Sequence, residues 1–328
     1  MNYEIKCGDV LEQLATMADG SVQCCVTSPP YWGLRDYGVA GQIGLEATPD
    51  AYVEKMVSVF RQVRRVLRDD GTLWLNIGDS YNSAASGQNG MGGTLDGGKP
   101  CGGRGTTAGR RPMLSSLKPK NLCMIPWRVA LALQADGWWL RSVIVWAKKS
   151  PMPESVTDRP TSSWEPIFLM AKSERYFYDA EAVKEQTQDK EYATVGKIRP
   201  TADGGPGFEI RGGLHNQEGG RPFRNQRNVW HLGPEPYAEA HFATFPTEIP
   251  RRAIMAGSRP GDTILDPFNG SGTTGAVALQ HDRRYIGIEL NPEYVRLAHD
   301  RIGKAVRPTT YQSTKQDDAP LFTMDVDR

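Results

Sequence analysis

The feature that most constrains the fold is a short strand that runs directly into a glycine-rich turn near the end of the chain. The apolar strand pattern Thr263–Asp266 leads into Asn269-Gly270-Ser271-Gly272, and a helical pattern begins at Thr273. A second strand pattern, residues 285–290, carries Glu289. This order of strand, turn, helix and strand predicts a unit of a parallel sheet covered by helices. Glycines at such a turn allow close approach of a ligand, and an acid about twenty residues later can hold ribose hydroxyls.

Alternating strand and helix patterns extend through most of the chain. Thr48-Pro49 predicts a helix start, apolar residues recur at helical spacing from Val53 to Leu67, and Gly71 is expected to end this helix. The other predicted helices cover residues 125–135, 273–279 and 291–302. The other predicted strands cover residues 22–27, 72–77, 140–146 and 165–170, the last two as a hairpin. Together these elements predict an α/β protein whose mostly parallel sheet has helices on both faces.

The composition is that of a globular protein. Charged residues make up 23% and apolar residues 39% of the chain, which excludes a disordered acidic or basic protein. No stretch approaches the roughly 18 apolar residues of a membrane span. The N-terminus lacks a signal-peptide pattern, so a cytoplasmic protein without membrane contact is expected. The cysteines form no CxxC pair, and Cys24 and Cys25 are expected to be buried reduced thiols. The histidines show no metal-ligand spacing, so no metal is expected.

Glycine and basic residues gather in the middle of the chain. Ten of the 23 residues from Gly87 to Gly109 are glycine, which predicts a long mobile loop. From Gly97 to Arg128 there are seven basic residues and no acidic one. This charge pattern suits contact with phosphates, and a solvated loop with incidental charge is the alternative.

A second motif, Thr27-Ser28-Pro29-Pro30-Tyr31-Trp32, follows the predicted strand 22–27. The prolines remove two backbone donors and stiffen the turn, so that carbonyl groups there face outward as fixed acceptors. These carbonyls and the Ser28 hydroxyl can accept hydrogen bonds from an exocyclic amino group, while Tyr31 can stack on a planar base. The alternative is a rigid turn without a chemical role. Both motifs lie at strand exits, where open α/β sheets bind ligands.

Together the two motifs resemble those of the amino-directed DNA methyltransferases of the permuted beta group, which methylate exocyclic nitrogens with S-adenosylmethionine. TSPPYW is similar to the catalytic motif of that family, and DPFNGSGTT is similar to its cofactor loop. In that family the catalytic strand precedes the cofactor strand, as it does here. Methyltransferases that act on protein glutamine carry a similar Pro-Pro-Tyr but resemble the unpermuted order. The resemblance covers about residues 3–178 and 230–303.

The resemblance implies a fold and a division of the chain. The fold would be a Rossmann-like methyltransferase sheet, circularly permuted, with a target-recognition insertion. The implied regions are a catalytic half at 1–84 and 121–178, a Gly-rich basic loop at 85–120, a target-recognition region at 179–240, a cofactor-binding half at 241–305 and a flexible tail at 306–328.

The resemblance also implies roles for individual residues. Within the catalytic residues Ser28, Pro29, Pro30 and Tyr31, the Ser28 hydroxyl and the Pro29 carbonyl would accept hydrogen bonds from the target amino group. Tyr31 would stack on the flipped base, with Trp32 beside it. The S-adenosyl-L-methionine site would include Asp9, Phe245, Pro246, Thr247, Asp266, Phe268, Gly270, Gly272, Thr273 and Glu289. The DNA-binding residues would be Trp32, Arg104, Arg110, Arg111, Lys118, Lys120, Arg221, Arg224 and Arg227.

Some of these roles have structural alternatives. Asp9 is equally suited to cap a helix N-terminus. Asp79, which follows the predicted strand 72–77, would be either a supporting residue of the site or a cap. Arg159, Trp164 and Glu165 lie in a stretch common to the family, where a purely architectural role is the alternative.

The expected activity is transfer of a methyl group to the exocyclic amino group of a flipped base in double-stranded DNA. Ser28 favours cytosine N4, since Ser at this position resembles the N4-cytosine enzymes, whereas Asp or Asn resembles the N6-adenine enzymes. Adenine N6 stays open, as does RNA. A nicotinamide-binding oxidoreductase would carry GxGxxG early in the chain, and an inactive DNA-binding module would not need both motifs. A homodimer and a cognate restriction enzyme are further partners that the resemblance suggests.

Overall fold

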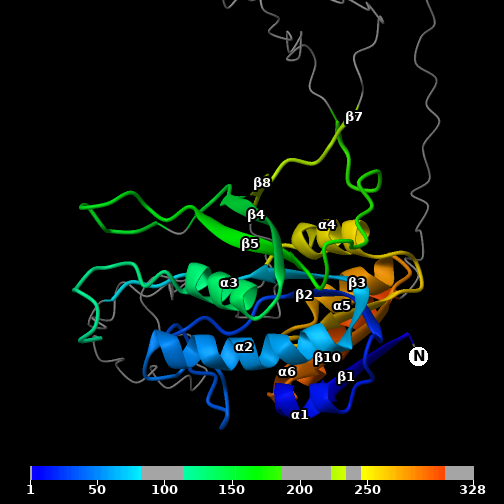
Figure 1. The fold of residues 1–328 in the computed structure, drawn as a ribbon, viewed down its shortest axis with the longest axis horizontal. Coiled ribbons are helices and arrows are strands. Elements are labelled where there is room, and N and C mark those ends of the chain that lie inside the picture. Colours follow the sequence, from blue (N-terminus) through cyan, green and yellow to red (C-terminus); the bar gives the residue numbers. More distant parts are fainter. Residues whose placement is uncertain (1, 83–113, 152, 187–222, 234–244, 307–328) are drawn as a thin grey trace, which may run out of the picture.

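The computed structural model describes residues 2–82, 114–151, 153–186, 223–233 and 245–306. In this part of the chain an eight-stranded sheet lies between two layers of helices (Figure 1). In their order across the sheet, the strands are β1 (Tyr3–Cys7), β10 (Arg284–Glu289), β9 (Thr263–Asp266), β2 (Val22–Thr27), β3 (Leu67–Asn76), β5 (Trp164–Ala171), β4 (Trp139–Lys148) and β8 (Val229–Leu232). A separate pair joins β6 (Glu185–Gln186) to β7 (Phe223–Arg224).

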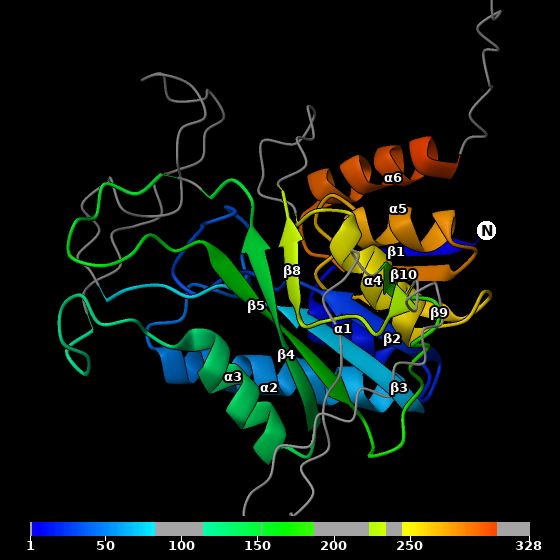
Figure 2. The same ribbon diagram turned by 90° about the horizontal axis from the view of Figure 1, so that it is seen from above.

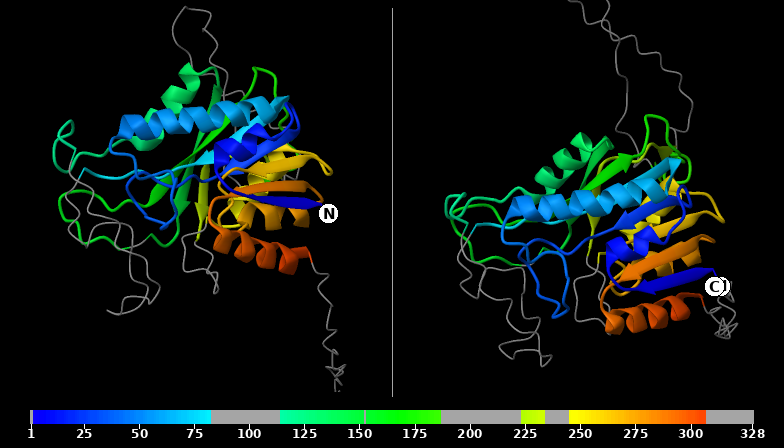
Figure 3. Two further views of the ribbon diagram at one scale, coloured as in Figure 1. Left: turned by 90° about the horizontal axis from the view of Figure 1, so that it is seen from below. Right: turned by 60° about the horizontal axis from the view of Figure 1, so that its bottom comes forward.

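The helices divide between the two faces of the sheet (Figures 2 and 3). One face is covered by α1 (Val10–Ala15), α2 (Pro49–Val66) and α3 (Ile125–Ala135), and the other by α4 (Glu248–Gly257), α5 (Thr273–Gln280) and α6 (Pro292–Val306). None of the described helices is both long and apolar enough to cross a membrane.

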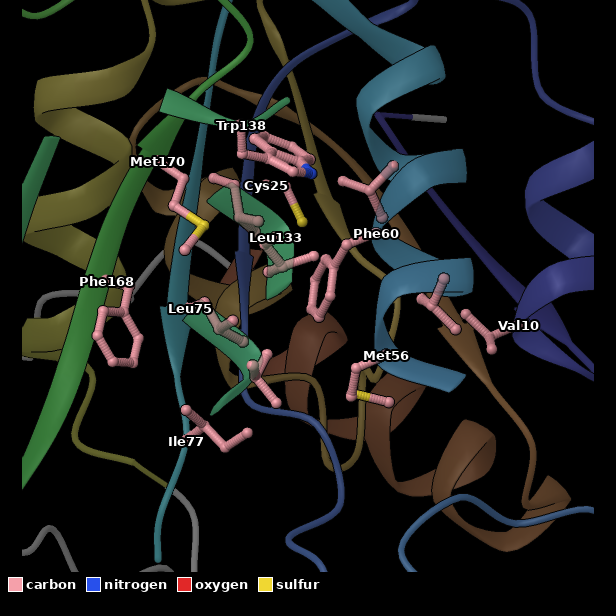
Figure 4. Close-up of a cluster of buried hydrophobic side chains, with 14 of the residues drawn as sticks. Val10, Cys25, Met56, Phe60, Leu75, Ile77, Leu133, Trp138, Phe168 and Met170 are labelled. Carbon is pink, nitrogen blue, oxygen red and sulfur yellow. The ribbon is translucent and has the colours of Figure 1, made fainter. Parts of the chain in front are cut away.

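Alternation along the central strands explains why the core has two layers. Cys25 of β2 and Leu75 of β3 lie in the same cluster as Met56 of α2 (Figure 4). Their neighbours Cys24 and Trp74 belong to the cluster on the opposite face, under α4, α5 and α6. A strand in the middle of a parallel sheet is buried on both faces because its side chains alternate between them. Cys24 and Cys25 are buried free thiols, as predicted.

The strand order opens a crevice in the middle of the sheet. All neighbouring pairs from β1 to β3 are parallel, whereas β5 is antiparallel to β3 and to β4. β9 comes late in the chain yet lies directly beside β2, which comes early. After β9 the chain crosses one face through α5 to β10, and after β2 it crosses the other face through α2 to β3. The loops at the carboxyl ends of β9 and β2 therefore diverge, which is where open α/β sheets bind ligands.

Several predicted elements are confirmed, whereas the boundary between the first long helix and the strand that follows it was wrong. The strands 22–27 and 263–266 and the helix 125–135 have the predicted bounds, and β4 and β5 form the predicted hairpin. The first long helix does not continue to Gly71. It ends at Val66, because Leu67 begins β3 and pairs with Val22 of β2.

The region 179–240, predicted as a target-recognition insertion, contributes a strand to the main sheet. β8 is the edge strand and pairs with β4 in parallel. Trp230 of β8 is 1% exposed, and its ring stacks on that of Trp74 at a centroid distance of 6.3 Å. β8, in the described part of this region, therefore belongs to the central fold. Most of the predicted loop 85–120 and nearly all of the predicted tail 306–328 lie outside the described residues.

Candidate active site

One cavity at the carboxyl ends of the central strands receives residues from both sequence motifs. Its volume is about 340 Å³. Ser28–Tyr31, which follow β2, line it together with Asp266 at the end of β9, Phe268 and Gly270 after β9, and Glu289 at the end of β10. The direct pairing of β2 with β9 explains why motifs from opposite ends of the chain meet here.

Asp266 holds the ends of β2 and β9 together at this cavity. Its Oδ1 accepts hydrogen bonds from Thr27 Oγ1 at 2.7 Å and Phe268 N at 3.1 Å, and its Oδ2 accepts one from Thr274 Oγ1 at 2.8 Å. Burial raises the pKa of Asp266 to about 6, although these hydrogen bonds oppose the shift. Asp266 thus has a clear structural role in addition to the ligand contact that the sequence predicts for it.

Glu289 holds the glycine turn from the neighbouring strand. Its Oε2 accepts a hydrogen bond from Gly270 N at 2.8 Å, and its Oε1 accepts one from Asn291 N at 2.9 Å. Burial raises the pKa of Glu289 to about 7. Gly270 has a φ of 51°, in the left-handed region that favours glycine. Because Glu289 also lines the cavity, its remaining lone pairs can accept hydrogen bonds from ligand hydroxyls.

The other predicted cofactor residues divide into two groups. Asp9, Phe245 and Thr273 line the cavity, whereas Pro246 and Thr247 do not line it. Asp9 is also the N-cap of α1, since its Oδ1 accepts hydrogen bonds from Leu11 N at 2.8 Å and Glu12 N at 3.2 Å. Asp9 therefore caps α1, which was the structural alternative, and also lines the cavity.

Gly272 does not line the cavity, and the structure gives it a different role. A Cβ atom added to Gly272 would lie 2.9 Å from Cβ of Ala298 in α6. Its φ of 80° is also in the left-handed region. Gly272 therefore permits the close packing of α5 against α6 and the turn that starts α5, and its contact with a ligand stays a prediction.

The Ser-Pro-Pro-Tyr turn is held against α2. Tyr52 Oη donates a hydrogen bond to the Pro30 carbonyl at 2.9 Å, and Pro29 is buried. Ser28 and Tyr31 are half-buried, and Ser28 Oγ lies 3.4 Å from Tyr31 Oη. The turn therefore presents a hydroxyl and an aromatic ring to the cavity from a fixed backbone.

A buried polar cluster extends this site into the sheet. Glu165 of β5 is 6% exposed, and its Oε2 accepts hydrogen bonds from Tyr31 Oη at 2.7 Å and Asn76 Nδ2 at 3.3 Å. Its Oε1 accepts one from Lys148 Nζ at 2.5 Å. Burial, followed by the charge of Glu165, raises the pKa of Tyr31 well above its usual value. Glu165, Asn76 and Lys148 all line the cavity.

Sequence reasoning gave no chemical role to Glu165, Asn76 or Lys148 of this cluster. Its one visible signal was an acid, Glu165, inside the otherwise apolar pattern Trp164–Ala171, since a buried acid needs partners. The partners themselves could not be read from the sequence, because Lys148 and Asn76 come from β4 and β3. Two aromatic residues of the cavity were also missed. Tyr37 and Tyr294 meet edge to face at a centroid distance of 6.2 Å.

The structure contradicts the expected contact between Trp32 and a base. Trp32 is 1% exposed, and its Nε1 donates a hydrogen bond to the Glu46 carbonyl at 2.8 Å. A fully buried, hydrogen-bonded indole is a core residue. Asp79 proves to be a cap, since its Oδ1 accepts hydrogen bonds from Ile125 N, at the start of α3, at 3.0 Å and from Ser80 N at 2.8 Å.

Only some of the predicted DNA-binding residues lie in the described part of the chain. Arg104, Arg110, Arg111 and Arg221 lie outside it. Lys118 is exposed, and so is Lys120, which forms an ion pair with Asp158 at 2.6 Å. Arg224 and Arg227 each lie 3.3 Å from Glu185 and so stabilise the β6–β7 pair.

The segment that carries Lys118 and Lys120 is tied to the chain that leaves β3. Cys123 N donates to the Ser80 carbonyl at 2.8 Å, and Lys120 N donates to the Asn82 carbonyl at 2.8 Å. These contacts place the two lysines at the same end of the sheet as the cavity.

Comparisons with known proteins identify the family. The family model described as DNA methylase, N6_N4_Mtase, matches residues 22–300. The chain is 48% identical over 295 residues to the Type II methyltransferase M.Cfr9I of Citrobacter freundii, covering 90% of this chain and 86% of the relative. It is 32% identical over 306 residues to the DNA adenine methyltransferase YhdJ of Escherichia coli K12, covering 91% and 82%.

A solved structure shows the same fold. The PvuII DNA methyltransferase, described as cytosine-N4-specific, superposes with a TM-score of 0.60 at 20% identity, over 92% of this chain and 86% of that one. The chain therefore belongs to the N6/N4 DNA methylase family and is a DNA amino-methyltransferase that uses S-adenosyl-L-methionine.

Proposed function

We propose that this enzyme methylates the exocyclic N4 nitrogen of a cytosine in double-stranded DNA. The observation that carries the proposal is the single cavity in which the Ser28–Tyr31 turn meets the glycine turn at Gly270 and the carboxylate of Glu289. One turn supplies acceptors and a stacking surface for an amino-bearing base, and the other supplies the geometry of a nucleoside site.

The residues of the cavity fit S-adenosyl-L-methionine. A volume of about 340 Å³ is large enough for a small-molecule site, for which roughly 300–1,000 Å³ is usual. Glu289 would accept hydrogen bonds from the ribose hydroxyls, and Gly270 lets the cofactor approach the backbone. Tyr37 and Tyr294 would provide aromatic surface for the adenine. When bound, the cofactor supplies a methyl group on a positively charged sulfur.

The chain's own residues would prepare the amino nitrogen for attack on that methyl group. The lone pair of such a nitrogen is delocalised into the ring, so it is a poor nucleophile. Hydrogen bonds from its N–H groups to Ser28 Oγ and the Pro29 carbonyl would favour a more tetrahedral nitrogen with an available lone pair. Tyr31 would stack on the flipped base. The methylated nitrogen would lose its extra proton afterwards, and Ser28 is not assigned as the acceptor of that proton. Positioning and electrostatics would supply most of the acceleration.

The assignment to cytosine N4 depends mainly on Ser28. A hydroxyl at the first motif position is typical of N4-cytosine enzymes, and the PvuII enzyme of the same fold is described as cytosine-N4-specific. Adenine N6 is the second candidate, because the relative YhdJ, at 32% identity, is described as a DNA adenine methyltransferase.

The proposed partners follow from the relatives and the basic residues. M.Cfr9I is a Type II methyltransferase, so we propose a cognate restriction enzyme that cleaves the same site. Lys118 and Lys120 would contact DNA phosphates near the cavity. A homodimer stays a prediction from the family resemblance.

The target base can be identified directly. The enzyme and S-adenosyl-L-methionine are incubated with amplified genomic DNA, which contains no methylated bases but a wide range of short sequences. The DNA is digested to nucleosides and analysed by mass spectrometry, with Ser28→Ala as the control. We expect N4-methylcytosine as the product and at least a tenfold lower yield with the control, because a lost transition-state hydrogen bond costs about that much or more.

The outcomes separate the two levels of the proposal. Formation of N6-methyladenine alone would overturn the cytosine assignment and leave the amino-methyltransferase activity intact. Formation of N4-methylcytosine at an equal rate by Ser28→Ala would remove Ser28 from the mechanism. Absence of any methylated nucleoside would count against the whole proposal.

A further inference from the structure

A chain of hydrogen bonds leads from the Ser28 hydroxyl into the sheet. Ser28 Oγ lies 3.4 Å from Tyr31 Oη, and Tyr31 Oη lies 2.7 Å from Glu165 Oε2. Tyr31 Oη also lies 3.2 Å from Asn76 Oδ1. The chain joins the turn after β2 to buried side chains of β3 and β5, and all four residues line the cavity.

The orientation of the Asn76 amide follows from its partners. One end of the amide lies 3.3 Å from Glu165 Oε2 and 3.1 Å from the Pro166 carbonyl. A carbonyl oxygen and a carboxylate can only accept hydrogen bonds, so the atom facing them must be the donor Nδ2. The other atom, Oδ1, is an acceptor and faces Tyr31 Oη.

The direction of the hydrogen bonds in the chain is therefore fixed. Tyr31 Oη has one hydrogen and faces two acceptors, Glu165 Oε2 and Asn76 Oδ1. The hydrogen goes to the carboxylate, which is closer and charged. Tyr31 then has only a lone pair for Ser28, so the hydroxyl hydrogen of Ser28 points to Tyr31. Both lone pairs of Ser28 Oγ are left for a ligand.

We infer that Glu165, Asn76 and the Tyr31 hydroxyl are positioning residues that keep the Ser28 hydroxyl oriented as a hydrogen-bond acceptor toward the target amino group. The inference rests on the proposed role of Ser28. A free serine hydroxyl rotates and can donate or accept, whereas an amino group with two N–H bonds needs an acceptor. The hydrogen-bond chain therefore makes this hydroxyl an acceptor toward the ligand, as an ionised carboxylate always is.

Two further contacts hold the side chains of this hydrogen-bond chain in place. Lys148 Nζ donates to Glu165 Oε1 at 2.5 Å, so both oxygens of the carboxylate are held. The ring of Tyr31 packs on Gly78, where an added Cβ would lie 2.4 Å from Tyr31 Cε2. The ring and the carboxylate therefore have little freedom to form another arrangement.

A double-mutant cycle between Tyr31 and Ser28 tests the inference. Tyr31→Phe keeps the ring and removes only the hydroxyl. The rate constant of methyl transfer in a single turnover is measured with saturating DNA and labelled S-adenosyl-L-methionine. We expect roughly a tenfold loss for Tyr31→Phe and about a hundredfold loss for Ser28→Ala. Because Tyr31 acts through Ser28, adding Tyr31→Phe to Ser28→Ala should cause no further loss.

Glu165→Gln tests the direction of the hydrogen bonds. The Lys148 ammonium requires the amide oxygen of the glutamine, so the amide NH2 would face Tyr31 and turn it from a donor into an acceptor. Tyr31 would then donate either to Asn76 Oδ1 at 3.2 Å or to Ser28 Oγ at 3.4 Å, so the Ser28 hydroxyl would no longer be held in one direction. We expect Glu165→Gln to lower the single-turnover rate in the presence of Tyr31 but not in the Tyr31→Phe background. A purely structural role for Glu165 would lower the rate in both.

A matched control and the cofactor affinity complete the test. Tyr52→Phe also removes a buried hydroxyl next to the turn, but this hydroxyl donates its hydrogen bond to the Pro30 carbonyl and not to Ser28, Tyr31 or Glu165. Any loss that it causes should be the same in the otherwise unmodified enzyme and in the Ser28→Ala background.

The dissociation constant of S-adenosyl-L-methionine, measured by calorimetry, should change less than about twofold in Tyr31→Phe and Glu165→Gln, which also shows that the variants are folded.

The results distinguish failure of this inference from failure of the proposed function. Additive losses for Tyr31→Phe and Ser28→Ala, or an unchanged rate for Tyr31→Phe, would overturn the positioning chain and leave Ser28 in its role. A full rate for Ser28→Ala would instead overturn the proposed role of Ser28, and the inference with it.

Discussion

The charge of Glu289 changes close to neutral pH. Burial raises its pKa to about 7, and its oxygens already accept hydrogen bonds from Gly270 N and Asn291 N. A ribose hydroxyl donates more strongly to a carboxylate than to a protonated carboxyl group. We therefore expect the affinity for S-adenosyl-L-methionine, measured by calorimetry, to increase as the pH rises from about 6 to about 8.

Glu289→Gln is the control for this prediction, because it keeps the shape of the side chain and cannot ionise. It should bind the cofactor roughly tenfold more weakly above pH 7 and lose most of the pH dependence. Asp266, with a pKa of about 6, also titrates beside the cavity. An unchanged pH dependence in Glu289→Gln would assign the effect to Asp266 instead.

The same carboxylate should affect stability in the opposite direction. The pKa of Glu289 is raised in the folded protein from its ordinary value of 4.5 to about 7. Between these values the folded state binds more protons than the unfolded state, so the free energy of unfolding falls as pH rises. Stability from this group is present below about pH 4.5 and is lost as the pH passes about 7. Urea unfolding at several pH values should show a smaller decline in Glu289→Gln than in the unmodified chain.

At the residue scale, the sequence predicts the place of a side chain best where the local turn alone determines that place. Ser28 could be placed at the site because it lies in the stiff turn that follows β2, and Glu289 because it ends the strand that comes after the glycine turn. Glu165 could not, because its partners are set by the pairing of β4, β5 and β3. The predicted contact of Trp32 with a base was wrong, because the sequence does not show which of two adjacent aromatic rings is buried in the core.

At the scale of elements, the close packing at the start of α5 against α6 depends on the missing side chain of Gly272. Gly272 has a φ of 80°, and an added Cβ would lie 2.9 Å from that of Ala298. Gly272→Ala should therefore destabilise the protein both by backbone strain and by overpacking, together about 2–4 kcal/mol, measured by urea unfolding.

Gly261→Ala is the matched control for this contact. Gly261 has a similar φ of 84°, but an added Cβ would meet nothing within 4 Å. It should lose only the roughly 1–2 kcal/mol of backbone strain. Equal losses in the two variants would mean that α6 moves away to accommodate the added methyl group.

The predicted elements agree with the structure where turn residues mark their ends. Strand 263–266 ends at the glycine turn, and α2 begins at Pro49 with Thr48 as its cap, Thr48 Oγ1 accepting a hydrogen bond from Ala51 N at 3.2 Å. The predicted end of α2 was wrong because no glycine, proline or other turn residue directly follows Val66 to mark the end of the helix. Apolar Leu67 fits both the helical spacing and the buried strand that follows, so the sequence pattern could not locate the change. β8 is short and at the sheet edge, where the pattern is weakest.

At the scale of the whole molecule, the strand order turns two distant motifs into one site. β2 and β9 are separated by most of the chain, yet their pairing brings Thr27 within 2.7 Å of Asp266. The sequence predicted that both motifs lie at strand exits. It could indicate their adjacency only through resemblance to a family, because strand order depends on contacts between residues far apart in the chain.

DNA binding is also a property of the whole molecule, because phosphate contacts act together. Lys118 and Lys120 are exposed at the end of the sheet where the cavity lies. If each neutralises one phosphate, replacing both by Gln should reduce the slope of log affinity against log salt concentration by about 2, equally for all DNA sequences. Arg175→Gln is the control, since its side chain is 94% exposed beyond Ala171, at the opposite end of β5 from Glu165. Fluorescence anisotropy with a labelled duplex at several salt concentrations gives both slopes. An unchanged slope in the lysine variant would place the phosphate contacts elsewhere on the chain.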